Sequence, residues 1–413
     1  MRRCFSIPLR ECLACRPPPC FRRLRHLPPH SYLIDTCRRS LLWAVRNGNV
    51  TAVKLLIARG ADVNATCTPK RSCALMSACF EGFDGLARLL LNAGAHVNQS
   101  NEQGYTPLIV AAMQGRESCV ELLLDSGAEV DQHMTTEGAA TALLAAAQQG
   151  HVRCVSMLLA AGGRVNQANE NGDVPLGAAA YKGQVACAER ILLAGASVDH
   201  ANARGATPLG LACYGGHAKC AALMLSHGAS IDHAADGGRT CMYAASRLGH
   251  VECVQILSSF GARRSDIGAV GNVGAEETCE AFGHAGLAEW LRLSRGWTPL
   301  HHIEQLTVER ATELLRAGAD VHAASAAGGP TPVARAAALQ PQTDVSAIVQ
   351  RAALPWSTHE HQLFPRPARA RAVALLMIGH RLASEPRFNG ESHSLLDAWR
   401  HVVMSFAVTR DSA

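Results

Sequence analysis

Residues 205–233, GATPLGLACYGGHAKCAALMLSHGASIDH, are one copy of a pattern that recurs along most of the chain. Thr207 directly precedes Pro208, which is typical of a helix start, because the threonine hydroxyl can cap the first turn and that turn does not use the N–H that proline lacks. Glycines follow each short apolar stretch, and Gly228 is the last of them. Glycine ends helices because it adopts the left-handed backbone conformation at little cost. The stretch therefore predicts two short helices, followed by an extended finger over residues 230–238.

Two independent series of marks give the period of this pattern. The helix starts are spaced by 33, 33, 35, 33, 33 and 33 residues, and the closing glycines by 34, 33, 35, 33, 33 and 33. The agreement defines seven units, and a unit of this size must stack on its neighbours to bury its apolar faces. The helix starts are Ser40, Cys73, Thr106, Thr141, Val174, Thr207 and Thr240, and the closing glycines are Gly60, Gly94, Gly127, Gly162, Gly195, Gly228 and Gly261.

The 33-residue period, the Thr-Pro-Leu helix start, the Gly-His turn and the Gly-Ala-x-x-Asp/Asn ending resemble the ankyrin-repeat family. This resemblance implies an all-α fold, an ankyrin-repeat solenoid of stacked helix-turn-helix units with β-turn fingers, holding about nine to ten repeats over residues 35–354. It also implies a non-catalytic scaffold that binds a protein partner on the concave face, which the finger tips and the first helices form.

The pattern becomes irregular after Gly261. Residues 263–273 contain turn residues but no Asp-Val-Asn finger, and Gly318 follows Gly261 by 57 residues, so that nine residues of one finger are missing. We therefore expect a degenerate seam near residues 263–297, which contains an eighth unit. A ninth unit from Gly296 is expected to be regular again, and a tenth to begin at Thr331.

Four segments follow from these marks. They are a basic, Cys- and Pro-rich disordered tail over 1–34, seven regular repeats over 35–262, degenerate and regular repeats over 263–354, and a C-terminal helical extension over 355–413.

Charge and hydropathy limit the classes of protein to consider. The net charge of +5 is concentrated in residues 1–34, which carry seven arginines and one acid, so that the rest of the chain has a net charge of −1. Such an array lacks the clustered positive charge that nucleic-acid binding needs, and no nucleic acid is expected as the main ligand. No apolar run approaches the length of a membrane span, so a soluble protein without a membrane span is expected.

Five of the sixteen cysteines recur at one position of the repeat. Stacked helices lie about 8–10 Å apart, whereas the Cα atoms of a disulfide lie within about 7 Å. The five are therefore interpreted as small buried apolar residues, which favours a reducing compartment, the cytoplasm or the nucleus. They are Cys119, Cys154, Cys187, Cys220 and Cys253.

The N-terminal tail leaves alternatives open. It lacks the apolar region of a secretory signal, and its three consecutive prolines favour disorder. Organelle targeting is one alternative, and a zinc site is another, because Cys12, Cys15, His26 and His30 have a C-x2-C-x10-H-x3-H spacing.

The C-terminal extension departs from the repeat. Its W-S-x-x-x-H-x-L-F-P-x-x-x-R beginning is similar to the tail of expanded ankyrin families of algae and plants. A final helix is expected to cap the open end of the solenoid with a face at helical spacing. That face comprises Leu395, Leu396, Trp399, Val402, Val403 and Phe406.

Local signatures of catalysis are missing from the sequence. It contains no phosphate-binding loop, no G-x-S-x-G elbow, no H-E-x-x-H helix and no set of kinase motifs. We therefore expect no enzyme, no catalytic residues, no cofactor and no metal. The alternative of a metal at His359, Glu360 and His361 is weak, because alternate residues of a short loop seldom complete a tetrahedral site.

Partner-binding residues are expected where the copies differ on the concave face. Aromatic residues and arginine are over-represented where binding energy concentrates, and three of the five tyrosines fall on this face. The alternative is a variable solvated surface with scattered aromatics. The candidates at the ends of the first helices are Phe80, Glu81, Met113, Gln114, Gln148, Gln149, Tyr181, Lys182, Tyr214 and Arg247, and those beside the fingers are Tyr105, Arg204 and Arg239.

A second class of function rests on the tail. Residues 392–407 have the outline of the adaptor helix of ankyrin proteins with a SOCS box, although Trp399 replaces the expected cysteine, and they faintly resemble part of an F-box. This alternative predicts a substrate-receptor subunit of a ubiquitin ligase, in which the repeats select a target and the tail docks an adaptor.

Overall fold

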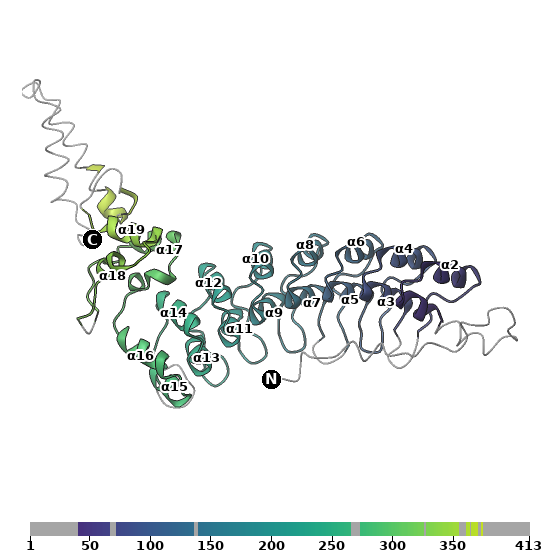
Figure 1. Cartoon of the computed structure of the whole chain (residues 1–413), viewed down its shortest axis with the longest axis horizontal. Coiled ribbons are helices and arrows are strands. Elements are labelled where there is room, and N and C mark those ends of the chain that lie inside the picture. Colours follow the sequence, from purple (N-terminus) through teal and green to yellow (C-terminus); the bar gives the residue numbers. More distant parts are fainter. Residues whose placement is uncertain are drawn as a thin grey trace, which may run out of the picture. The chain divides into compact units, whose positions relative to one another are not determined.

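The computed structural model describes residues 40–66, 72–135, 139–265, 273–325, 328–354, 361–363, 365–370 and 373–374 (Figure 1). Within these ranges the regular structure is helical, apart from isolated bridge residues such as the antiparallel pair His133 and Thr141. The expected all-α solenoid is confirmed. None of the helices in these ranges is long and apolar enough to cross a membrane. The expectations for residues 1–34, for the metal alternative at 359–361 and for the final helix concern parts outside the described side chains.

The chain divides into two compact units, with the boundary between residues 236 and 237. This division comes one repeat before the boundary expected at residue 262. The first unit contains a helix over residues 40–46, α2 (Val50–Ala58), α3 (Ala74–Glu81), α4 (Asp84–Asn92), α5 (Pro107–Met113), α6 (Glu117–Asp125), α7 (Ala142–Gln149), α8 (Val152–Ala160), α9 (Pro175–Lys182), α10 (Val185–Leu193), α11 (Pro208–Gly215) and α12 (Ala218–Ser226).

In the first unit the helices form two rows (Figure 1). The first helices α3, α5, α7, α9 and α11 pack in sequence, and the second helices α4, α6, α8, α10 and α12 do the same. The first helices begin as the sequence predicts. The hydroxyl oxygens of Thr106 and Thr141 accept hydrogen bonds from backbone N–H groups three residues on, at 3.2 and 3.3 Å. Gly150 ends α7 with a φ of 85°, a conformation that a side chain would strain.

The cysteine column is buried, as predicted. All five members are free thiols with at most 1% of their surface exposed. Burial raises the pKa of the Cys154 and Cys187 thiols to about 11, because the thiolate would lose its solvation. These residues therefore act as small core residues between neighbouring second helices.

Side chains at the start of each finger join one repeat of the first unit to the next. In each case the Oδ1 atom of an asparagine or aspartate accepts the backbone N–H of a residue 31 to 33 positions later, at 2.7–2.9 Å. We call this series the Asx ladder, and it comprises Asn64, Asn98, Asp131, Asn166 and Asp199. Since each bond crosses between units, the ladder fixes the spacing of the fingers.

The second unit contains the irregular repeats. Its described elements are α13 (Cys241–Leu248), α14 (Val251–Ser259), α15 (Ala275–Ala281), α16 (Ala285–Leu293), η3 (Pro299–His301), η4 (Ile303–Gln305), α17 (Val308–Arg316), α18 (Pro332–Ala338), α19 (Asp344–Ala352) and η5 (His361–Leu363). The pairs α15–α16 and α18–α19 confirm the predicted eighth and tenth units.

The ninth unit differs from its expectation, because its first helix consists of two short 3-10 turns, η3 and η4. Thr307 is extended and caps α17, accepting the N–H of Arg310 at 3.2 Å. Thr307 thus follows the cap Thr298 by nine positions, whereas in the regular unit His217 follows Thr207 by ten. The shorter stretch also contains Leu306 in an extended conformation, so no full α-helix fits.

Candidate functional site

Two tyrosines lie side by side at the ends of neighbouring first helices. Tyr181 on α9 and Tyr214 on α11 occupy the same repeat position, and their ring centroids are 6.3 Å apart with the planes inclined by 21°. Both side chains are half-buried, and the ammonium group of Lys182 lies 5.4 Å from the Tyr181 ring centroid. The period of 33 residues, together with the packing of α9 on α11, therefore places two aromatic rings in a stack.

The remaining candidates of the first helices lie at equivalent helix ends. Phe80, Glu81, Met113, Gln114 and Gln148 are half-buried, whereas Gln149 and Lys182 are exposed. Side chains from the turn of the next repeat contact the carbonyl groups at two of these helix ends. The Arg116 side chain donates from Nε to the Phe80 carbonyl at 3.2 Å, and Nε2 of His151 lies 3.2 Å from the Met113 carbonyl.

The finger-side candidates differ in exposure. Tyr105 has only 5% of its surface exposed, so it contributes to packing and offers almost no area to a partner. Tyr105 directly precedes Thr106, the N-cap of α5, and its side chain is buried at this helix start. Arg204 is exposed beside the finger, and its carbonyl accepts the N–H of Asp236 at 3.0 Å. Arg204 is therefore accessible to a partner, whereas Tyr105 is not.

Arg239 and Arg247 belong to the second compact unit and are exposed. The Arg247 guanidinium lies 5.2 Å from the ring centroid of Phe282, and the Arg247 carbonyl lies 3.0 Å from Nε2 of His284. Arg247, on α13, is therefore held against the turn that follows α15. The surface formed by first-helix ends α3 to α11, which we call the tyrosine face, consists of first-unit residues.

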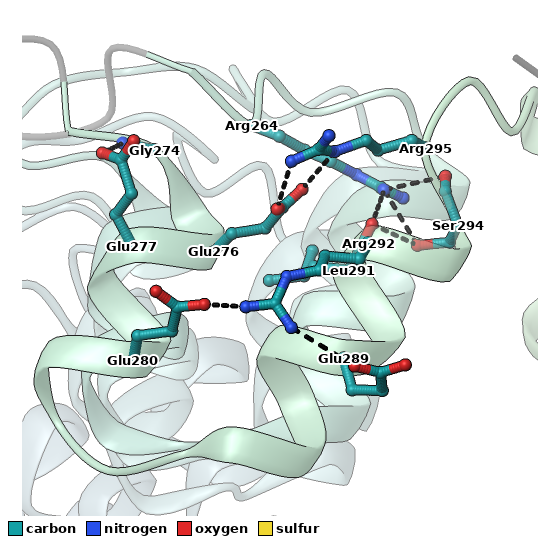
Figure 2. Close-up of polar contacts among 10 residues, drawn as sticks. All are labelled: Arg264, Gly274, Glu276, Glu277, Glu280, Glu289, Leu291, Arg292, Ser294 and Arg295. Carbon is teal, nitrogen blue, oxygen red and sulfur yellow. Dashed lines mark hydrogen bonds and ion pairs between the residues drawn. The ribbon is translucent and has the colours of Figure 1, made fainter. Parts of the chain in front are cut away.

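The seam contains a half-buried arginine, Arg264, that sequence reasoning did not single out. Arg264 stands where the regular fingers have a valine, such as Val165. Figure 2 shows its guanidinium at the end of α16, where Nη1 donates to Oγ and the carbonyl oxygen of Ser294, both at 2.9 Å. Its central carbon lies 5.5 Å from the ring centroid of Trp290. Burial lowers the pKa of Arg264 to about 10, so it stays protonated at neutral pH. The sequence signal that could have identified this residue is an arginine at a position where the regular fingers have valine.

Ion pairs surround this arginine (Figure 2). Glu276 on α15 accepts two hydrogen bonds from Arg295, at 2.6 and 2.9 Å, and these bonds lower the pKa of the Glu276 carboxyl. Arg292 on α16 pairs with Glu280 of α15 and with Glu289 of its own helix. The acidic side chains of α15, the first helix of this unit, are thus paired with arginines at and just after the end of α16, its second helix.

Aromatic rings and histidines fill the space beyond the seam. Trp297 lies 5.8 Å from His301 and 5.2 Å from His302 between ring centroids, and the Arg335 guanidinium lies 4.1 Å from the Trp297 centroid. His302 is 1% exposed. Burial, with the charges of Arg264 and Arg335, lowers the pKa of His302 to about 3. The cluster is therefore uncharged at its histidines near neutral pH.

The described side chains include no group of three or more His, Cys, Asp or Glu residues that could hold a metal ion. The tyrosine face presents aromatic, amide and basic side chains, among them Tyr181, Gln149 and Lys182.

Several characterised proteins share short stretches with this chain. An ankyrin repeat-containing protein of Treponema pallidum is 40% identical over 85 residues, which cover 21% of this chain and 28% of that protein. The E3 ubiquitin-protein ligase KEG of Arabidopsis thaliana is 38% identical over 77 residues, covering 19% and 5%. The ankyrin repeat and KH domain-containing protein mask of Drosophila melanogaster is 36% identical over 103 residues, covering 24% and 2%. The chain thus spans less than a third of the length of each relative.

The family profile described as ankyrin repeats (3 copies) matches three overlapping ranges, residues 41–134, 130–202 and 178–270. Together they run from residue 41 to residue 270, which is more than half of the 413 residues. On this match, and on the stacked helix pairs described above, the chain belongs to the ankyrin-repeat family.

Proposed function

We propose that this chain is a non-catalytic scaffold that binds a protein partner on the tyrosine face, with the stack of Tyr181 and Tyr214 at the centre of the contact. Ankyrin repeats are protein-interaction modules, which supports the general role. The observation that carries the specific proposal is the stack itself, because two half-buried aromatic rings 6.3 Å apart form a large, rigid contact area. Such rings bind with little loss of side-chain entropy.

The residues around the stack support this assignment. Gln148 and Gln149 lie at the end of the neighbouring helix α7, and Lys182 lies over the edge of the stack. Exposed Arg204 adds a basic group beside the next finger. An aromatic centre with a polar rim is the arrangement found at protein interfaces, because the rim excludes water from the centre.

The test replaces both rings and compares partner binding. The variant Tyr181→Ala/Tyr214→Ala is expected to reduce the affinity for a partner captured by the wild-type chain at least about tenfold, measured with the purified partner. Leu193→Ala is the matched control, because Leu193 on α10 is 71% exposed and lies among the second helices. An unchanged affinity for the folded double variant would show that the assignment is wrong.

The buried free thiols of the cysteine column support a cytoplasmic or nuclear location, which we infer as part of this proposal. Expression of a fluorescent fusion would test it, since fluorescence in a secretory compartment would contradict the inference.

The ubiquitin-ligase alternative stays a prediction from sequence. Residues 392–407, on which it rests, lie outside the described residues, and the similarity to KEG covers 5% of that protein. Recovery of a Skp1-like, elongin or cullin protein with the wild-type chain, and its loss in Trp399→Ala, would support this alternative over the plain scaffold.

A further inference from the structure

The second unit contains a hollow of about 640 Å³ between the end of α17 and a segment described over residues 361–363 and 365–370. Three arginines from these two parts line it, Arg316 from α17 and Arg366 and Arg369 from the segment. The size is within the range of small-ligand sites.

The wall opposite α17 is held in place by packing and hydrogen bonds. Leu363 is 8% exposed and packs into the same core cluster as Leu315 and Val349, and Ala368 is 2% exposed. Arg316 donates from Nε to the Gln362 carbonyl at 3.1 Å and from Nη2 to Oε1 of the Gln362 side chain at 3.2 Å. The hollow is therefore bounded by anchored elements on both sides.

The charged groups that line the hollow are three guanidinium groups and one carboxylate. The carboxylate of Glu313, which also lines the hollow, is paired with Arg310 at 3.1 Å. The last carbonyls of α17 already accept backbone N–H groups of residues 317–319, at 2.9–3.1 Å. Nε of Arg369, in contrast, is buried without a hydrogen-bond partner among the described residues. A buried unpaired donor is costly, and the side chain that carries it lines the hollow.

We propose that this hollow binds a phosphate group, either as free phosphate or on a phosphorylated protein segment. Guanidinium groups donate paired hydrogen bonds to phosphate oxygens, and three arginines match the charge and the three free oxygens of a phosphate monoester better than those of a single carboxylate. Arginine clusters are a recurrent means of recognising phosphorylated segments. The site belongs to the second unit and shares no residue with the tyrosine face.

The test uses the full chain and two probes at constant ionic strength, inorganic phosphate and a short peptide with one phosphoserine. The wild-type chain should bind both saturably in calorimetric titrations. Arg366→Gln should weaken binding about tenfold, through the loss of one charge-assisted contact, and Arg190→Gln should leave it unchanged, because it removes the same charge from an exposed site on α10. Arg369→Gln should weaken binding at least as much as Arg366→Gln.

The probes also separate the two sources of the group. Tighter binding of the phosphopeptide than of inorganic phosphate supports the site and assigns it to a protein segment, whereas equal affinity supports the site and assigns it to free phosphate. Absence of saturable binding in the wild type, or equal affinities in Arg366→Gln and Arg190→Gln, would overturn the proposal. Arg366 is exposed, so its variant tests the proposal even if Arg369→Gln does not fold.

Discussion

Neighbouring repeats are joined differently in the first unit and at the seam of the second. In the first unit the Asx ladder accepts backbone N–H groups across each junction, and valines such as Val165 follow the closing glycines. At the seam, Arg264 replaces the valine and donates to the end of α16, while within that unit Glu276 pairs with Arg295 and Glu280 pairs with Arg292. The comparison teaches that one repeat position can carry either a valine or a charged side chain that donates to the next unit, and we expect the two kinds of junction to respond differently to mutation.

The largest expected effect comes from changing Arg264 to valine, the residue of the regular fingers. We expect Arg264→Val to lower the free energy of opening of α16 by about 3 kcal/mol, because the Ser294 and Leu291 acceptors lose a charged donor in a partly buried place. Amide hydrogen exchange of peptides from α15 and α16 would measure this, since repeat arrays open locally.

Arg164→Val is the matched control for this comparison. Arg164 is an exposed arginine of the regular region that pairs with Asp131 at 3.5 Å, and its loss should cost at most about 0.5 kcal/mol. Equal changes in the two variants would remove the distinction between the two kinds of junction.

A somewhat smaller effect is expected from acid. The ordinary pKa of histidine is about 6.5, and that of buried His302 is about 3. Below pH 6.5 the unfolded chain therefore binds a proton that the folded chain does not, and stability is lost as the pH falls from about 6.5 towards 3. At pH 4.5 this amounts to about 2.5 kcal/mol.

His302→Asn should therefore lose less stability than the wild type between pH 7 and pH 4.5, as measured by urea unfolding followed by the fluorescence of Trp290 and Trp297. Identical pH dependences would show that His302 is not the group that makes this part of the second unit sensitive to acid.

The smallest effect concerns the Asx ladder. Asn166→Ala removes the acceptor of the Ser197 N–H, a bond of 2.9 Å at an exposed junction, and should cost about 1 kcal/mol in the opening of α10. Asn92→Ala, at the exposed end of α4, removes an asparagine outside the ladder and should change stability by less than about 0.5 kcal/mol. An effect of Asn166→Ala no larger than that of Asn92→Ala would show that the ladder contributes little.

The regular repeats were predictable because local signals and packing agree there. Thr106 caps and Gly150 terminates as their residue types require, and the next unit follows at a fixed distance. The 3-10 turns at Pro299–His301 were not predictable from the Thr-Pro-Leu signature alone. These turns form because Thr307 caps α17 one position earlier than the regular unit would place that cap. The effect of this early cap on the preceding helix becomes visible only when both elements are placed together.

The repeat positions of the candidate site residues could be predicted from the sequence, but the exposure of their side chains could be predicted less well. The common repeat position of Tyr181 and Tyr214 implied proximity, and the rings do stack. Tyr105 is also a tyrosine and lies beside a finger, yet its ring is buried. The exposure of a side chain depends on how the adjacent helix start packs, not on the residue type alone. Arg264 was likewise visible as a departure from valine, but its hydrogen bonds to α16 depend on the tertiary fold.

The cysteine column has a further consequence for how the opening of this protein can be followed. Each regular unit from Cys119 to Cys253 contains a thiol of the cysteine column that is at most 1% exposed, and a reagent can reach it only when that unit separates from its neighbours. Because a thiol must also be deprotonated to react, the native Cys154 and Cys187, with pKa values of about 11, are protected twice. Alkylation followed by peptide mass spectrometry would therefore report, one repeat at a time, the order in which the array comes apart.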